Sequence, residues 1–380
     1  MARLGEIFDL QMGKTPSRNK SNYWTDGQYS WVSIADLGTY QKYVGATKEE
    51  ISEVAVRESE IKSVPANTVI MSFKLSLGKT AITKEEVYTN EAIMAFIPTG
   101  KYDVLPDYFY HLFTGKDWSK ETNRAVMGAT LNKAMLSEIS VPVPLIDEQR
   151  KIAAVLDKVS DLIAKRRQQL DKLDELVKAK FVEMFGDPVS NSLNFPLLSL
   201  PQLGEFGRGV SKHRPRNAPE LLGGKYPLIQ TGEVANSELY ISSYENTYSE
   251  FGFKQSKMWK SGTLCITIAA NIAKTAILAF DACFPDSVVG FVANEKTNNI
   301  FIHYWFGFFQ QILEAQAPES AQKNINLKIL SELEVIVPPI ELQNQFATFV
   351  EQTEKTKTTI SESLQQLETL KKALMQEYFG

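Results

Sequence analysis

The sequence predicts an α+β fold, in which two similar mixed α/β domains are separated by two long antiparallel helices that form an intramolecular coiled coil with pseudo-two-fold symmetry. The first observation behind this prediction is an internal duplication. A shift of 194 residues (330 − 136) superimposes Leu136–Gly186 on Leu330–Gly380 without a gap. The second observation is that no glycine or proline interrupts the segment from Asp147 to Phe185. A repeat unit this long is not that of a solenoid and indicates that a whole module was duplicated.

Both copies of the duplicated segment have the features of a helix start. Each opens on a proline-bearing stretch, Pro142–Pro144 or Pro338–Pro339, and proline suits the approach to a helix but not its interior. Asp147 and Glu341 follow, where the positive end of the helix dipole favours an acidic side chain. Further matched positions are Val143 with Val337, Gln149 with Gln343, Ala153 with Ala347, Leu170, Leu173 and Leu176 with Leu364, Leu367 and Leu370, and Phe185-Gly186 with Phe379-Gly380. We therefore expect helices over residues 144–186 and 338–380.

The apolar residues of these helices form a heptad seam. In the first copy they recur at steps of four and three, and Arg166 interrupts the pattern. The members are Ile152, Leu156, Val159, Ile163, Leu170, Leu173, Val177 and Met184. In the second copy polar Thr353 and Lys357 occupy the seam before apolar residues resume at Ile360. As a helix, the first uninterrupted segment would be about 58 Å long.

Two arrangements of the long helices are open. Each helix could pack only on its own domain, as an ordinary amphipathic helix does. Two seams of common origin, however, most simply face each other. Because each helix follows its own domain along the chain, the pair is then expected to be antiparallel.

Composition bounds the class of protein. The chain has 380 residues, of which 43% are hydrophobic and 23% charged, and this is enough for two or three cores. The net charge of −4 excludes a uniformly basic nucleic-acid coat but not a local basic face. The two cysteines, Cys265 and Cys283, suggest small core residues of a cytoplasmic protein rather than a disulfide scaffold. We expect no signal peptide at Met1–Leu10 and no membrane span.

The predicted domain division is residues 1–143, the first helix 144–186, residues 187–337 and the second helix 338–380. In the first domain, short β-branched runs between turn residues predict strands, and an aromatic run predicts a short helix at Tyr108–Phe113. The expected strands are Trp31–Ile34, Thr68–Phe73, Lys79–Ile82 and Ile93–Pro98. Glycine, proline, asparagine and serine between Gly186 and Pro196 indicate a linker.

The second domain repeats the first more loosely. Tyr29–Leu37 resembles Tyr226–Val234, and Leu77–Ile82 resembles Ile272–Ile277. The loops differ strongly, because residues 14–28 have almost no counterpart in 208–225. This is the pattern of two binding domains on one scaffold with different targets, although drift in tolerant loops explains it equally well.

These residues carry a family resemblance that covers the whole chain. The order of domain, long helix, domain, long helix resembles the specificity subunit of type I restriction-modification enzymes. The motifs that carry it are Leu4–Ile7, Gly13–Pro16, Tyr23-Trp24 ahead of Trp31–Ile34, Asp147–Ala153, Met184–Pro188 and Val337–Gln343. No single motif is very specific, whereas the full duplicated arrangement is.

The resemblance implies that the chain is a targeting subunit and not an enzyme. Each domain would be a target-recognition domain that reads one half of a bipartite, asymmetric site on double-stranded DNA. The paired helices would set the spacer between the halves and dock two methyltransferase (modification) subunits. Restriction subunits would join through that complex, which would carry adenine methyltransferase and endonuclease-translocase activity.

The residues themselves suggest no catalytic, cofactor or metal site. Asp187-Pro188-Val189 lacks the second proline and the aromatic residue of an adenine methyltransferase loop. Gly13-Lys14-Thr15 and Gly78-Lys79-Thr80 have Phe8 and Phe73 where a phosphate-binding loop requires glycine. The three histidines, His111, His213 and His303, lack a spacing suited to zinc.

The candidate DNA-binding residues are cations and their polar neighbours in loops, because phosphates require Lys and Arg. The first domain contributes Lys14, Thr15, Arg18 and Lys20, and the second contributes Arg208, Lys212, His213, Arg214 and Arg216. Lys254, Lys257 and Lys260 lie around Trp259, and Lys79 and Lys274 recur at matching positions. Without the family resemblance, these would more often be solvated loops.

Two other functions are compatible with the sequence. The chain could be an orphan DNA-binding protein with no methyltransferase partner. It could also be a coiled-coil scaffold whose globular domains bind proteins. Retention on duplex DNA separates the scaffold from both DNA-binding functions.

Overall fold

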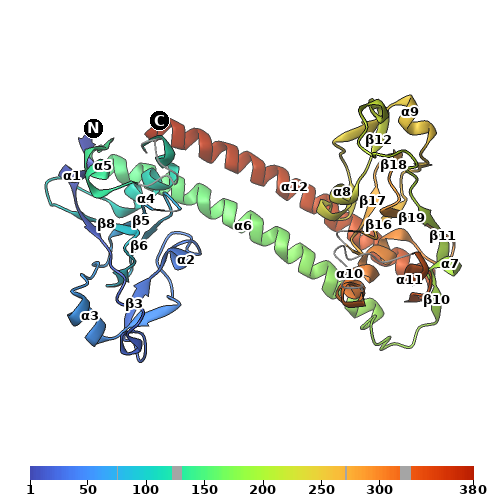
Figure 1. The fold of residues 1–380 in the computed structure, drawn as a ribbon, viewed down its shortest axis with the longest axis horizontal. Coiled ribbons are helices and arrows are strands. Elements are labelled where there is room, and N and C mark those ends of the chain that lie inside the picture. The colour runs from blue at the N-terminus through green and yellow to red at the C-terminus, as the bar shows by residue number, and fades with distance from the viewer. Residues whose placement is uncertain (75, 122–130, 270–271, 317–326) are drawn as a thin grey trace. The chain divides into compact units, whose positions relative to one another are not determined.

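The computed structural model describes residues 1–74, 76–121, 131–269, 272–316 and 327–380, which form two compact units (Figure 1). Unit 1 comprises Met1–Arg167 with Glu362–Gly380, and unit 2 comprises Gln168–Ser361. The two long helices, α6 (Ile146–Phe185) and α12 (Ile340–Phe379), each contribute one part to unit 1 and the other part to unit 2.

Unit 1 contains two sheets of short strands, one antiparallel and one mixed. An antiparallel sheet has the order β2-β8-β5-β6, and a three-stranded sheet has the order β4-β3-β7 with β3 and β7 parallel. The strands are β1 (Ala2–Arg3), β2 (Phe8–Met12), β3 (Tyr29–Val32), β4 (Glu49–Ile51), β5 (Val69–Ser72), β6 (Thr80–Ile82), β7 (Tyr88–Thr89), β8 (Ile93–Pro98) and β9 (Ser140–Val141). The short helices are α1 (Leu4–Ile7), α2 (Ile34–Leu37), α3 (Glu53–Ser59), α4 (Pro106–Gly115) and α5 (Lys133–Glu138), with 3-10 turns at Ser21–Tyr23 and Trp118–Glu121.

One predicted strand was wrong at its end. The strand expected over Trp31–Ile34 ends at Val32, because Ser33 caps the helix α2 instead of continuing the strand. The Ser33 hydroxyl accepts a hydrogen bond from the Asp36 backbone N–H at 3.1 Å, and the Asp36 carboxylate accepts one from the Ser33 N–H at the same distance. This reciprocal capping box starts a helix despite the β-branched Ile34.

Among the described residues, unit 2 repeats this frame with one more strand in each of these two sheets. Its first sheet has the order β11-β19-β16-β17-β13, and its second the order β14-β12-β18-β15. The strands are β10 (Leu197–Ser199), β11 (Gly204–Arg208), β12 (Leu222–Leu228), β13 (Tyr240–Ile241), β14 (Asn246–Tyr248), β15 (Met258–Trp259), β16 (Leu264–Thr267), β17 (Thr275–Leu278), β18 (Ala282–Cys283), β19 (Val288–Ala293) and β20 (Glu334–Ile336). The helices are α7 (Leu200–Leu203), α8 (Thr231–Asn236), α9 (Glu250–Lys254), α10 (Asn299–Gln316) and α11 (Leu327–Ser331), with a 3-10 turn at Pro219–Leu221. The loose sequence repeat between the domains is therefore also a repeat of topology.

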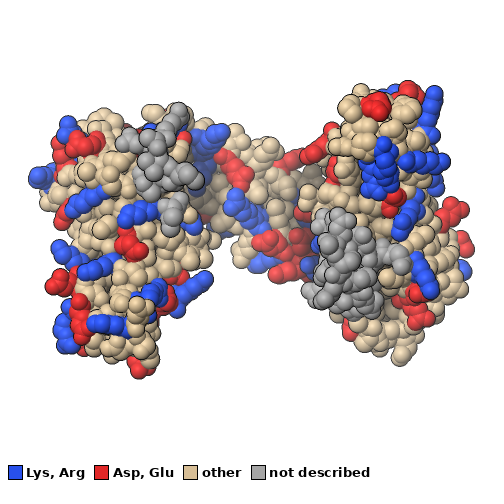
Figure 2. Space-filling view, viewed as in Figure 1, with Lys and Arg blue, Asp and Glu red and all other residues tan. Residues whose placement is uncertain are grey.

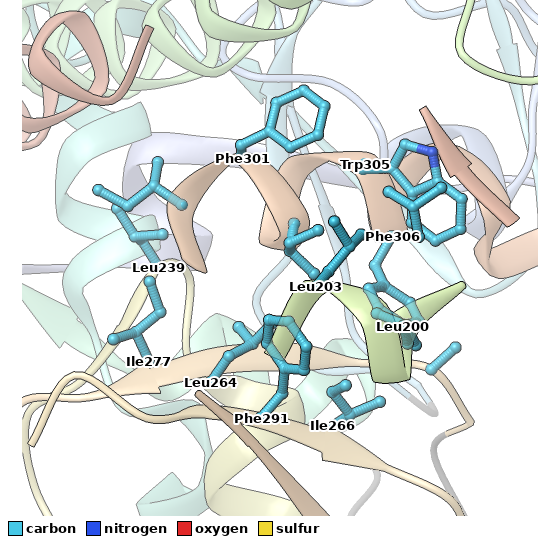
Figure 3. Packing of buried hydrophobic residues seen from close by; sticks show 14 of the residues in the cluster. Leu200, Leu203, Leu239, Leu264, Ile266, Ile277, Phe291, Phe301, Trp305 and Phe306 are labelled. Atoms are coloured by element: carbon cyan, nitrogen blue, oxygen red, sulfur yellow. The ribbon is translucent and has the colours of Figure 1, made fainter. Parts of the chain in front are cut away.

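The core of unit 2 lies between its first sheet and helix α10 (Figure 3). Leu264 and Phe291 project from the strands, and Phe301 and Trp305 project from α10 toward them. All four side chains are fully buried. Cys265 and Cys283 are buried without a disulfide, which confirms that they are core residues. Within the described residues, no helix combines the length and apolar character needed to cross a membrane.

The two long helices are continuous over 40 residues each, as predicted. Helix α6 ends at a glycine, Gly186, whose φ of +69° lies in the left-handed region that glycine adopts without strain. Its N–H still donates to the Val182 carbonyl at 2.8 Å, which closes the last turn.

A repeated glutamine fastens the start of each long helix to its own domain. The Gln149 amide donates to the carbonyls of Asp103 at 2.8 Å and Pro144 at 2.9 Å, and its oxygen accepts from the Leu105 N–H. The Gln343 amide likewise donates to the Lys296 and Pro338 carbonyls, and its oxygen accepts from the Thr297 hydroxyl. Both glutamines are fully buried, so these bonds explain why the duplicated segment keeps this residue.

The end of each long helix completes the core of the other repeat. In unit 1, Phe379 of α12 meets Tyr108 of α4 edge to face at 5.4 Å between ring centroids. The C-terminal end of α12 lies beside α4 there (Figure 1). In unit 2, the ring centroids of Phe181 and Phe185 of α6 lie 5.3 and 5.5 Å from the ring centroid of Phe346 of α12. The helices thus pack on their own domains and on each other, as an antiparallel pair.

An ion pair joins α6 and α12 in each unit, with the acids but not the bases at repeat-equivalent positions. Arg167 of α6 contacts Glu368 of α12 at 2.6 Å in unit 1, and Lys357 of α12 contacts Asp174 of α6 at 2.8 Å in unit 2. The shift of 194 residues (368 − 174) relates the two acids. Lys357 is buried in the seam, where the sequence had shown only an interruption.

We predict that the α6 end carries much of the stability of unit 2. Phe181→Ala should lower the free energy of unfolding by about 3–5 kcal/mol, because the ring is fully buried among aromatic side chains. Chemical denaturation followed by tryptophan fluorescence checks this, since Trp305 lies in the same core. The neighbouring Val182→Ala is the control, because Val182 is 43% exposed and should change stability by less than about 1 kcal/mol. Equal effects of the two substitutions would contradict the arrangement.

Candidate nucleic-acid interface

The first basic loop, Gly13–Lys20, leaves strand β2 and is tied down through its backbone. The Lys14 N–H donates to the Thr89 carbonyl at 2.8 Å, and the Trp31 indole N–H donates to the Lys14 carbonyl at 3.1 Å. A Cβ at Gly13 would lie 2.3 Å from the Asn90 carbonyl oxygen, so only glycine fits where the loop begins. The backbone of this loop is therefore positioned by the sheet.

Three of the four candidate side chains in the first basic loop are held by acids. Arg18 donates to Glu49 at 2.9 Å, and its guanidinium lies 3.7 Å from the centroid of the Trp24 ring. Lys20 lies 2.7 Å from Glu58, and this hydrogen bond raises the lysine pKa. Thr15 donates to Glu91. The side chain of Lys14 has no ion pair with any residue that the structure describes.

The second basic loop, Arg208–Arg216, is anchored to helix α9. The N–H groups of Lys212 and His213 both donate to the side-chain oxygen of Gln255, the residue after α9. The His213 ring lies 5.8 Å from the ring of Phe251 on the same helix, and its Nε2 lies 3.6 Å from Glu220. The loop and α9 therefore form one surface.

The charges of the second basic loop are only partly balanced. Arg214 and Arg216 share one carboxylate, Asp286. Within the described part of the chain, the side chains of Arg208 and Lys212 form no ion pair. The loop consequently keeps an excess of positive charge. On the face drawn in Figure 2, Lys and Arg side chains gather on the part of unit 2 that carries β12 and α9.

The structure brings Lys254 to this surface, because it ends α9 next to Gln255. Lys257 lies over Trp259, with its Nζ 3.8 Å from the ring centroid. Lys260 pairs with Asp281 at 2.7 Å. Of these three cations, only Lys260 is held by a carboxylate among the described residues.

Lys79 and Lys274 lie in repeat-equivalent pockets that share no residue with the basic loops. The pocket of Lys79, of about 230 Å³, is also lined by Gly38 and Tyr110. The pocket of Lys274, of about 410 Å³, is also lined by Lys178 of α6 and by His303. The structure thus separates these two lysines from the other candidates.

A polar pocket beside the second basic loop was missed by sequence reasoning. It measures about 310 Å³ and is lined by Arg216, Asn217, Gln230 and Asn246 among others. Asparagine and glutamine amides are the side chains that read adenine edges. These residues are spread along the chain with no common motif, and only the folding of β12, α8 and β14 brings them together.

The histidines have structural environments. Burial lowers the pKa of His303 to about 4, and its Nδ1 lies 2.9 Å from the Thr275 hydroxyl. His111 Nε2 lies 2.8 Å from Asp157. In the portion of the chain that the structure describes, no group of three or more His, Cys, Asp and Glu side chains is arranged to hold a metal ion.

Comparison with known proteins places the chain among DNA specificity proteins. A family model for the type I restriction modification DNA specificity domain matches residues 1–175 and again 200–369. The type I restriction enzyme MjaIX specificity subunit of Methanocaldococcus jannaschii is 31% identical over 189 residues, which cover 49% of this chain and 43% of that protein. The EcoR124I/EcoR124II specificity subunit of Escherichia coli is 32% identical over 187 residues, or 47% and 45%. The alignments thus span less than half the length of these two relatives.

A solved structure shares the fold over the full chain. The S subunit of a type I restriction-modification system from M. genitalium superimposes with a TM-score of 0.61 and 12% identity, covering 100% of this chain and 95% of that one. At this identity the likeness concerns the fold alone, and it confirms the predicted fold class.

Proposed function

The chain belongs to the type I restriction modification DNA specificity family, and from this premise we propose that it is the DNA-reading specificity subunit of a type I restriction-modification complex. The observation that carries this proposal is the double match of the family model, once on each repeat. The two repeats share their frame but differ in the basic loops at residues 13–20 and 208–216. Each domain would therefore read a different half of a bipartite, asymmetric site.

In this function the chain performs no chemical step itself. It would direct the adenine methyltransferase activity of modification subunits, and the endonuclease-translocase activity of restriction subunits, to a site on double-stranded DNA. The complex would work in the cytoplasm. The domain division into residues 1–143 and 187–337, with helices 144–186 and 338–380 between and after them, is part of this proposal.

The ion pairs of the second basic loop suggest which side chains would bind phosphates and which would read bases. Cations that lack an acidic partner are available for phosphates, and in the second basic loop Arg208 and Lys212 form no ion pair with a described residue. Arg214 and Arg216 form ion pairs with Asp286, so they would have to give up this carboxylate in order to bind a phosphate. The amides of the adjacent pocket would read base edges.

The long helices support a role in spacing. A continuous helix of 40 residues is about 60 Å long, and one DNA turn rises about 34–36 Å. Half-sites whose centres lie one to two turns apart fit this length.

Exposed apolar side chains on the helices support docking of modification subunits. Leu176 on α6 and Leu370 on α12 are related by the duplication (370 − 176 is again 194), and they are 48% and 46% exposed. Val155 and Leu162 on α6 precede Leu176 at heptad spacing and are also exposed. Two copies of one surface element would dock two copies of one partner.

We predict that the unpaired cations of the second basic loop bind phosphate. Arg208→Ala with Lys212→Ala should weaken binding of the full chain to duplex DNA. The slope of log affinity against log salt concentration should become about 1.8 less steep, because each phosphate contact contributes about 0.9. Fluorescence anisotropy at several salt concentrations measures both quantities. The charge-matched control is Lys296→Ala with Lys328→Ala, on exposed residues away from this loop. Unchanged affinity and slope in the first variant would refute the assignment.

We predict that Leu176 and Leu370 each support one modification subunit. Leu176→Glu should reduce the number of bound modification subunits from two to one, and the double variant with Leu370→Glu should abolish binding, because a charge cannot be buried unpaired in an apolar contact. Native mass spectrometry of the co-expressed complex counts the subunits. Lys372→Glu, an exposed residue on another side of the same turn, is the control and should retain both. Two subunits on the double variant would disprove this docking surface.

A further inference from the structure

In unit 1, a partly buried ion-pair cluster joins the globular domain to helix α6. Lys42 lies on the segment after α2, and its side chain is 18% exposed. Its Nζ lies 2.6 Å from the carboxylate of Asp107, in the first turn of α4, and 2.6 Å from that of Asp157 on α6. Asp157 also contacts His111 of α4. The domain therefore contributes the base of this cluster, and the long helix contributes an acid.

In unit 2, a second cluster joins the globular domain to helix α12 with the opposite polarity. Lys357 of α12 is 7% exposed in its side chain and lies 2.8 Å from Asp174 of α6 and 3.1 Å from Glu354 of α12. It also pairs with Glu238, which lies on the segment after α8. Here the domain contributes an acid, and the long helix contributes the base.

The two clusters use the same segment of the repeated frame. Tyr43 forms a parallel bridge with Ile82, and Tyr240 pairs in parallel with Ile277, which matches Ile82 in the domain repeat. Lys42 precedes the first bridge by one residue, and Glu238 precedes the second by two. Each domain thus reaches its long helix through the residues just before this bridge.

Both lysines keep their charge in these surroundings. Burial alone would lower the pKa of Lys42 and of Lys357, but the hydrogen-bonded carboxylates around each outweigh that effect and raise it. A charged lysine that lost its carboxylates here would be poorly solvated. In unit 2 the domain's acid, Glu238, is 69% exposed, but the lysine that it contacts is 7% exposed. Reorienting a domain on its helix would take a carboxylate away from a buried or partly buried lysine, so each cluster opposes such a motion more than a pair of two exposed side chains would.

We propose that the residues of the Lys42 and Lys357 clusters are positioning residues for DNA recognition. They fix the orientation of each domain on the helix pair. This orientation determines how strictly the spacing between half-sites is read. The inference rests on the proposed function, because it concerns the geometry of that DNA reading. The reversed polarity also matches each domain to its own helix. If the first domain packed where the second domain packs, Lys42 would take the place of Glu238 and face Lys357. These two like charges would repel each other.

The test uses the complex of the full chain with its modification subunits. The recognised site is first found by mapping methylated bases in cells that express this complex. Three duplexes are then made, one with the natural spacer, one with a spacer longer by one base pair and one with a spacer shorter by one base pair. The variants are Lys42→Met, Lys357→Met and the conservative Lys42→Arg. Lys328→Met is the control, because its pair with Glu332 is exposed.

Lys42→Met and Lys357→Met should each reduce the discrimination between natural and altered spacers at least about tenfold, with a smaller change in affinity for the natural site. Lys42→Arg and the control should retain discrimination. A merely structural role would lower affinity for all three duplexes equally. Should a methionine variant fail to fold, Asp157→Asn or Glu238→Gln weakens the same cluster and gives the same readout.

The failures are distinguishable. If the wild-type complex binds none of the duplexes in a spacer-dependent way, the proposed function fails and this inference fails with it. If the wild type discriminates and the cluster variants discriminate equally well, the inference alone is overturned.

Discussion

The structure depends on aromatic residues at the end of each long helix that complete the core of the other repeat. Phe181 and Phe185 of α6 are fully buried with Phe346 and Phe301 in unit 2, and Phe379 of α12 packs on Tyr108 in unit 1. Removal of either helix end would leave a hydrophobic core open to water, at a cost of several kcal/mol for each large side chain. Neither globular core is therefore complete within a single copy of the duplicated segment.

Because each helix end packs into the core of the other repeat, the helices pair in one direction and one register. The buried glutamines Gln149 and Gln343 fix where each helix starts, and the aromatic ends fix where each helix finishes. Between these points the seam tolerates polar residues, provided that they find partners. Lys357 shows this, because three carboxylates surround it in a seam that is otherwise mostly apolar. A buried charge with these partners specifies register more strictly than another leucine would.

The sequence predicted the helices well because their signals are local. The duplication, the absence of glycine and proline, and the heptad spacing all lie within a single stretch of chain. The error at Ile34 arose from local chemistry too, since the capping box of Ser33 and Asp36 outweighed a β-branched residue. The partners of Lys357 were out of reach, because Asp174 and Glu238 lie more than a hundred residues away and only the fold brings them together.

The candidate site was less predictable for the same reason. The basic loops could be located from composition, but the carboxylates that neutralise parts of them, such as Asp286 and Glu49, come from distant strands and turns. The sequence could not distinguish Arg208 and Lys212, which form no ion pair with a described residue, from Arg214 and Arg216, which share Asp286. Nor could it place Lys79 and Lys274 in pockets of their own, or assemble Gln230 and Asn246 beside the loop.

In the proposed function, the paired long helices would set the separation of two unlike DNA-reading domains. The most direct measurement inserts one helical turn of four residues into both α6 and α12, at repeat-equivalent positions, and maps the methylated sites in cells that express the complex. We expect both half-sites to keep their base sequence while the unspecified spacer lengthens by about one or two base pairs. An unchanged spacer with full methylation would contradict it.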